Sequence, residues 1–160
     1  MSKAQTISTT ASDPTVAAAA AQFLSPLVLG LQALTINGKQ AHWHVRGANF
    51  VGVHELLDTI VANAGAAADN AAERIVALGL PVDARLSAVA EKVTTAVPAG
   101  FVQSSEVIRN VIADIDAILV DTKAAIDGLD EVDLTSQDVA IEIMRGLEKD
   151  RWFLLAHIAE

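Results

Sequence analysis

The chain has 160 residues and a net charge of −9, and this length is enough for one domain with a hydrophobic core. It has no cysteine, so disulfides and thiolate ligands are excluded and any bound metal must be held by nitrogen and oxygen. An acidic protein repels phosphate backbones and attracts cations, which favours metal ions over nucleic acids as partners. Hydrophobic residues make up 52% of the chain, a surplus that extensive subunit interfaces would explain.

Residues 1–12 are polar and rich in Ser and Thr. This composition predicts a flexible tail ahead of a single helical domain at 13–160. A tail that binds DNA needs several cations, because each phosphate contact uses one. Lys3 is the only Lys or Arg in the segment. We therefore expect DNA binding to be weak or absent.

A first long helix is predicted from Pro14 to about His42. Asp13 followed by Pro14 has the pattern of an N-cap and a first helical residue. No charge occurs between Pro14 and Gly38, a length sufficient for a membrane span. Several polar side chains interrupt the segment, so we interpret it as a buried helix of a bundle and expect no membrane association. One lysine far upstream is a poor secretion signal, and we expect a cytoplasmic protein.

The most informative stretch is a second predicted helix over residues 51–78. Apolar residues recur there at steps of three, four and seven, and Gly79 followed by Pro81 is a stop signal. Potential metal ligands occur in two pairs, and the members of each pair are four residues apart and share a helix face. At roughly 100° per residue, both pairs fall within an arc of about 100°. The pairs are His54 with Asp58 and Asp69 with Glu73.

One chain cannot place both pairs on the same metal. Asp58 and Asp69 lie roughly 16 Å apart along the helix axis, whereas metal–ligand bonds are about 2 Å long. A second copy packed antiparallel across a two-fold axis would place the first pair of each chain opposite the second pair of its partner. The two pairs of ligands define a stripe along one face of the helix. Small residues in the middle of this stripe would let the two helices approach closely: Ala62, Gly65, Ala66 and Ala68.

His42 is a candidate third ligand from the same chain as His54. It ends the first predicted helix, and only a short loop containing Gly47 and Gly52 separates the two histidines. Two imidazoles and three carboxylates suit iron, manganese or zinc better than magnesium or copper(I), and carboxylates that bridge would allow two metals per site. Either spaced pair alone is more often a solvated surface pair. The phased pairs together with His42 predict a metal site that exists only in the dimer.

Three further helices complete the predicted all-α chain. A short helix is expected over 84–93, a third long helix over 104–127, and a final helix from Thr135, as N-cap, to about Ala159. The third helix has an apolar core face that comprises Val107, Ile108, Val111, Ile115, Ile118 and Leu119. The final helix is expected to bury Ile141, Met144, Leu147, Phe153, Leu154 and Ile158. Acidic residues gather at 127–142, where the helix macrodipole is the ordinary explanation.

The motifs of the central region are Lys39-x-x-His42-Trp43, Gly47-x-x-Phe50, His54-x-x-x-Asp58 and Asp69-x-x-x-Glu73-Arg74. This pattern resembles the Dps family, the mini-ferritins named as DNA-binding proteins from starved cells. The resemblance covers the chain in length and helix order. It implies a ferritin-like four-helix bundle with a short extra helix between helices two and three. Ordinary ferritins place a Glu-x-x-His motif within each bundle, and this chain has none.

In the Dps family a ferroxidase centre lies at the two-fold interface. The resemblance implies a centre with ligands from two subunits: His42, His54 and Asp58 from one, and Asp69 and Glu73 from its neighbour. It also implies a hollow dodecamer that oxidises Fe(II) with peroxide or oxygen, stores ferric iron and protects against oxidative damage. Trp43, otherwise a packing residue, would be an electron donor to a reactive oxidant. Asp133 and Asp138 would line a negative pore through which iron enters.

Two other functions stay open on the sequence alone. The same ligands could hold a metal-bound water of near-neutral pKa and cleave amide or acyl bonds, which makes a metal-dependent hydrolase one alternative. A protein that coats DNA without catalysis is the other, and its binding would be strongly salt-dependent.

Overall fold

Four long helices, one short helix and two very short strands make up the described part of the chain. The structure is a computed structural model and describes residues 13–93 and 97–159. The predicted four-helix bundle with a short extra helix between helices two and three is confirmed. The tail predicted at 1–12 lies outside the described residues. In chain order the elements are α1 (Pro14–His44), β1 (Val45–Arg46), α2 (Phe50–Ala77), α3 (Leu86–Lys92), β2 (Val102–Gln103), α4 (Ser104–Leu129) and α5 (Leu134–Ala156).

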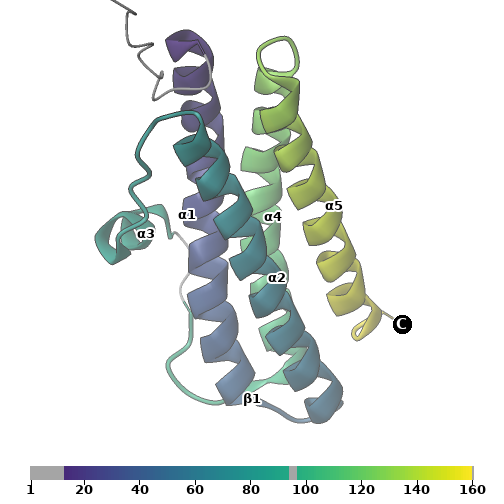
Figure 1. Ribbon diagram of the computed structural model, residues 1–160. Helices are drawn as coiled ribbons and strands as arrows, with labels where there is room; N and C mark the ends of the chain where they lie inside the picture. The colour runs from purple at the N-terminus through teal and green to yellow at the C-terminus, as the bar shows by residue number, and fades with distance from the viewer. Residues whose placement is uncertain (1–12, 94–96, 160) are drawn as a thin grey trace, which may run out of the picture.

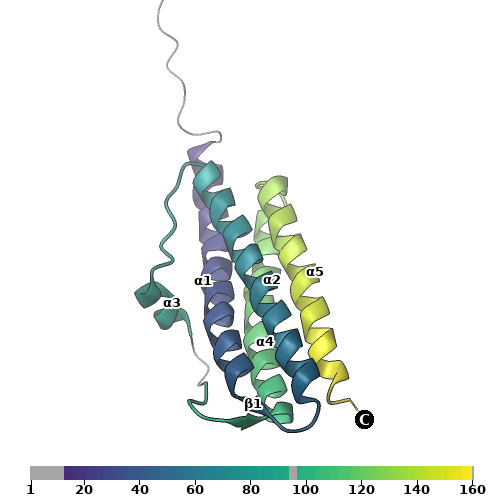
Figure 2. The same ribbon diagram turned by 60° about the horizontal axis from the view of Figure 1, so that its bottom comes forward.

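The long helices pair as α1 with α2 and α4 with α5, each pair antiparallel (Figure 1). From the far end of α2 the chain returns along one side of the bundle to the start of α4, and α3 lies on this crossover beside α1 (Figure 2). A parallel ladder pairs Val45 with Val102 and holds the end of α1 next to the start of α4. A single long crossover is one of the connectivities known for four-helix bundles, including the ferritin-like ones.

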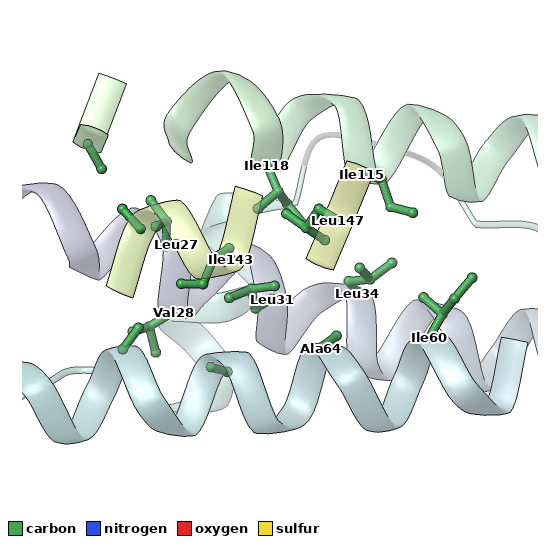
Figure 3. Close-up of a cluster of buried hydrophobic side chains, with 14 of the residues drawn as sticks. Leu27, Val28, Leu31, Leu34, Ile60, Ala64, Ile115, Ile118, Ile143 and Leu147 are labelled. Atoms are coloured by element: carbon green, nitrogen blue, oxygen red, sulfur yellow. The ribbon is translucent and has the colours of Figure 1, made fainter. Parts of the chain in front are cut away.

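The core is one apolar cluster to which all four long helices contribute (Figure 3). Its central side chains, such as Leu31, Ile60 and Ile115, have no exposed surface. Burying a side chain of this size contributes roughly 1.5–3 kcal/mol. Tertiary packing of these faces, more than intrinsic helix propensity, therefore stabilises the helices. The side chains labelled in Figure 3 are Leu27, Val28, Leu31, Leu34, Ile60, Ala64, Ile115, Ile118, Ile143 and Leu147.

α1 is a helix of the bundle. Within the part of the chain that the structure describes, it is the one helix long and apolar enough to cross a membrane by length and composition. It packs mainly against α2 and α4, and Leu24, Leu27 and Leu31 along it are fully buried. Its apolar residues are thus used in the core of the domain, as predicted.

α5 begins at a different cap from the predicted one. Asp133, not Thr135, is the N-cap, and its carboxylate accepts hydrogen bonds from the backbone N–H and the hydroxyl of Ser136. Arg74 of α2 donates a further hydrogen bond to the same carboxylate, at 2.7 Å. A contact between distant parts of the chain therefore selects the helix start.

The inward face of α5 also differs from the prediction. Leu147 and Leu154 are buried as expected, but Ile141 and Met144 are only partly buried and Phe153 is 37% exposed. Two polar side chains, Ser136 and Asp150, lie on the inward face, so the apolar periodicity of this helix is incomplete in the sequence. The buried residues of α5 are Ser136, Ala140, Ile143, Leu147, Asp150 and Leu154.

Candidate metal centre

A tight reversal between α1 and α2 brings His42 and His54 together. After α1 and β1 the chain turns through Gly47, whose φ of +98° lies in the region that favours glycine. A Cβ at this position would also collide with the side chain of Gln103. Glycine therefore lets the loop turn close against β2, so that α2 begins beside the end of α1 and its first turns face His42.

The two imidazole rings stack, with ring centroids 3.7 Å apart and an interplanar angle of 21°. His42 Nδ1–H donates to the His54 carbonyl oxygen at 2.8 Å, and His54 Nδ1–H donates to the His42 carbonyl oxygen at 2.9 Å. Because a carbonyl oxygen only accepts, both Nδ1 atoms carry a proton, and in the neutral imidazole the lone pair is then on Nε2. Histidines that bind metals usually donate their other ring N–H to a carboxylate, a backbone carbonyl or water.

Asp58, the third ligand predicted from this chain, lies one turn beyond His54. Its Oδ1 is 4.0 Å from His42 Nδ1 and accepts a hydrogen bond from Lys39 Nζ. This hydrogen bond lowers the pKa of Asp58 below its ordinary value, so the carboxylate is ionised at neutral pH. The Asp58 side chain is 53% exposed and therefore open to a ligand from solvent.

Asp69 and Glu73 lie farther along α2 and are exposed. Because α2 is one continuous helix from Phe50 to Ala77, both residues keep the predicted phase relative to His54. Across residues 13–93 and 97–159, no three His, Cys, Asp or Glu side chains converge into a metal site within this single chain. The joining of both halves of the stripe across a two-fold axis stays a prediction.

The small residues predicted to allow close helix approach are only partly available for it. Ala62 and Ala66 are exposed and Gly65 is partly exposed, so these three lie on the free face of α2. Ala68 is fully buried in the core, and its assignment to the stripe is wrong.

The two predicted pore residues differ in their surroundings. Asp133 has a side chain only 15% exposed, in an ion pair with Arg74 at 2.7 Å. Burial alone would raise the pKa of Asp133, but the hydrogen bonds from Ser136 and Arg74 outweigh it and lower the pKa. Asp133 thus links α2 to α5, whereas Asp138 is exposed on α5. The role of either residue in a pore stays a prediction.

Trp43 follows His42 directly, and its side chain is 62% exposed. Its role as a packing residue stays a prediction, because a side chain exposed on a single chain can pack at a subunit interface. Its role as an electron donor stays a prediction. Phe50, whose ring centroid lies 5.2 Å from that of His54, is a neighbour of the site that spacing alone did not single out.

That His42, His54 and Asp58 form the donor set of one chain stays a prediction, since these three side chains do not converge into a metal site within the described residues of the single chain. Nitrogen and oxygen donors of this kind suit iron, manganese and zinc, and an open cluster on a helix face leaves room for further ligands and an oxidant.

Comparisons with known proteins agree with the ferritin-like fold of the chain. Residues 27–160 match the sequence family described as Ferritin-like domain. The chain is 35% identical over 123 residues to a DNA protection during starvation protein of Mycolicibacterium smegmatis, a match that spans 75% of this chain and 66% of that relative, just under two thirds. A relative with the same description from Agrobacterium fabrum is 35% identical over 129 residues, 79% of this chain and 80% of its own length.

Solved structures give the same result. A structure described as Dps from Microbacterium arborescens in the high iron form is 69% identical, has a TM-score of 0.93, and is matched over 96% of this chain and 100% of its own. A tetragonal form of Mycobacterium smegmatis Dps is 29% identical, with a TM-score of 0.87, over 98% of this chain and 96% of its own. The sequence family, these relatives and the shared fold together show that the chain belongs to the Dps family of ferritin-like proteins.

Proposed function

We propose that this chain is a mini-ferritin that oxidises Fe(II) at sites shared between two subunits and stores the ferric product inside a hollow homo-oligomer. Membership of the Dps family supports an iron-storage role in general and an assembly of identical chains. The oxidation chemistry, the dinuclear site, the dodecamer and a cytoplasmic location are the specific parts of the proposal.

One observation carries the proposal furthest: the reciprocal hydrogen bonds between His42 and His54. Each Nδ1–H is held by the backbone carbonyl of the other residue, which fixes both ring planes and leaves both Nε2 atoms as donors. A pair of core histidines would need no such arrangement next to an exposed carboxylate. Here Asp58 stands beside the pair and is open to solvent.

In the proposed reaction, His42, His54 and Asp58 bind Fe(II) from one chain. Asp69 and Glu73 of the partner subunit supply the remaining oxygen donors. The carboxylates stabilise the higher charge of Fe(III), which favours loss of an electron from each ion. Two Fe(II) ions give one electron each to hydrogen peroxide, which takes up two protons and becomes two waters. Because both electrons arrive together, no hydroxyl radical is released.

The DNA-coating alternative receives little support from the surface charges. Leaving out Lys3, which lies outside the described residues, the chain has ten Lys and Arg, since 11 − 1 = 10. Six of these form ion pairs with Asp, and so their charges are already balanced: Lys39, Arg74, Arg85, Lys92, Lys123 and Arg151. Phosphate contacts need unpaired cations, so we propose weak or absent DNA binding.

Subunit complementation tests the shared site. Variants His54→Ala and Glu73→Ala should each oxidise Fe(II) slowly, because every site in either assembly lacks one ligand. In a mixed dimer one site combines both substitutions, but the other combines the intact His54 of one chain with the intact Glu73 of its partner. Random co-assembly should therefore restore about a quarter of the parental number of sites.

Recovery of about a quarter of the parental rate supports ligands from two chains. No recovery in assemblies shown to be mixed would contradict the proposal, since a site made by one chain cannot be complemented. A mixture of His54→Ala with His42→Ala is the matched control, because both losses fall on the same half of the site and a mixed dimer has no intact site. Hydrolysis of acyl amides without oxidant, at a rate that these variants abolish, would favour the hydrolase instead.

A further inference from the structure

A cavity of about 470 Å³ lies between α2 and α5, and none of the predicted metal ligands lines it. α5 lies beside α2 in both views of the bundle (Figures 1 and 2). The cavity has the volume of a small-molecule site. Its lining is apolar where the core reaches it, through Leu31, Ile143 and Leu147, and polar at side chains of α2 and α5.

The first polar group of interest is Asp150, which is only 4% exposed and lines this cavity. Asn63 Nδ2 donates to both of its carboxylate oxygens, at 3.0 and 3.2 Å. No ion pair joins Asp150 to a Lys, Arg or His in the described ranges. A buried carboxylate is ordinarily paired with a cation or a metal. Asp150 is therefore buried without an ion pair, and the charge that acts on it is that of Lys149, which lines the same cavity.

A second pair of the same kind lies farther along the cavity. Asn70 Nδ2 donates to Glu142 Oε2 at 3.3 Å, and both residues line the same space. Because α2 and α5 run antiparallel, the two Asn–carboxylate pairs mark two separate positions. Asn63 and Asn70 are seven residues apart and Glu142 and Asp150 are eight apart, which is roughly 10–12 Å along the helices.

The wall between the two pairs is kept small. Gly146 lies in the middle of α5 and lines the cavity, and a Cβ built on it would have no neighbouring atom within 4 Å. Alanine would therefore fit, and glycine here costs helix stability, about 1 kcal/mol relative to alanine. Ala64, Ala66 and Ala67 face the same space from α2. Packing therefore does not require glycine at this position, and its small size leaves the cavity open.

From the cavity, the two carboxylates and their spacing, we infer that this space binds a linear aliphatic polyamine. One terminal ammonium group lies between Asp150 and the side-chain oxygen of Asn63, and the other lies between Glu142 and that of Asn70. The methylene chain contacts the apolar wall. A triamine the length of spermidine spans the two positions, whereas a single metal ion does not. The inference is independent of the proposed iron chemistry.

Isothermal titration calorimetry of the intact assembly with spermidine tests the inference, in buffer of about 0.15 M salt so that diffuse surface charge is screened. Spermidine should bind with one site per chain. Butylamine, which has one ammonium group, and Mg²⁺ should bind at least about tenfold more weakly, since neither engages both carboxylates. Equal binding of either competitor would overturn the inference, because the cavity would then respond to charge alone.

Three variants locate the ligand. Asp150→Asn and Glu142→Gln should each weaken spermidine binding about tenfold, because each removes one charge-assisted hydrogen bond. Gly146→Leu should abolish binding by filling the cavity without removing a charge. Glu148→Gln is the matched control, because Glu148 is exposed on α5 and does not line the cavity. It should change the affinity less than twofold.

An equal loss in Glu148→Gln and in the two cavity variants would overturn the inference, and so would undiminished binding by a folded Gly146→Leu assembly. Circular dichroism and size-exclusion chromatography show whether each variant is folded and assembled. The Fe(II) oxidation rate provides a separate readout: loss of spermidine binding with an unchanged oxidation rate supports two independent sites. If the parental protein did not oxidise Fe(II), the proposed function would be contradicted, but the inference about this cavity would be unaffected.

Discussion

Replacing Gly47 by alanine should destabilise the protein mainly through the backbone. Gly47 has φ of +98°, and an L residue held in a sparsely populated backbone region costs of order 1–3 kcal/mol. A Cβ would also meet the Gln103 side chain, but at the far end of that flexible side chain, which can move away. Most of the cost should therefore remain even when Gln103 is shortened.

For a domain of this size, each kcal/mol lowers the melting temperature by roughly 2–4 °C, so Gly47→Ala should lower it by about 2–12 °C. Differential scanning calorimetry at one fixed protomer concentration measures this, because assembly makes the transition concentration-dependent. Gln103→Ala provides the second arm of a double-mutant cycle. In that background the cost of Gly47→Ala should stay within about 0.5 kcal/mol of its value in the parental chain.

Two outcomes would refute this reasoning. A decrease of less than about 2 °C would mean that the turn relaxes without strain. Full recovery in the double variant would mean that the steric contact, and not the backbone, accounts for the cost. Zn²⁺ titration adds a functional readout: since the turn sets the approach of His54 to His42, Gly47→Ala should also weaken Zn²⁺ binding at the interface site.

Three further substitutions test the electrostatics. Burial raises the pKa of Asp150 in the folded state above its value in the unfolded state. The stability that the protonated carboxyl provides is therefore present at low pH, below the unfolded pKa, and lost as pH rises through the folded pKa. Asp150→Asn removes the buried charge, so it should raise the melting temperature at pH 7 and lose this advantage near pH 4. Arg74→Ala leaves the half-buried Asp133 carboxylate without its cation and should cost about 1–3 kcal/mol in chemical denaturation, whereas no measurable cost would contradict the link between α2 and α5. Lys39→Met frees Asp58 from its ammonium partner and should strengthen Zn²⁺ binding in calorimetry; weaker binding would show that Lys39 assists the metal.

The helices and half of the site could be predicted because their determinants are local. The cap pattern at Asp13 and Pro14 predicts the start of α1, apolar periodicity predicts α2 and α4, and the spacing of His54 and Asp58 places both on one face of α2. The short loop after α1 is enough to predict that His42 approaches them. What spacing could not predict is the stacking of the rings and the reciprocal hydrogen bonds, because these depend on the angle at which two helices meet.

The errors have long-range causes. The cap of α5 was assigned to Thr135, but Arg74, distant in sequence, favours Asp133. On α5 the prediction matches at Leu147 and Leu154 but is one residue off at Ile141 and Met144, because polar residues such as Asp150 share the inward face and hide its periodicity.

The short ladder of β1 and β2 has a consequence for how the domain tolerates change. It fastens the turn beside the predicted metal ligands to the residues just ahead of α4, and the end of the crossover, at Pro98 and Phe101, contacts Gln40 and His44 of α1 as well. Residues inserted near α3 would lengthen a peripheral strap while both imidazoles stayed where they are. The crossover is therefore the place at which a peptide tag or a second domain could be grafted onto this scaffold with the least disturbance to metal binding.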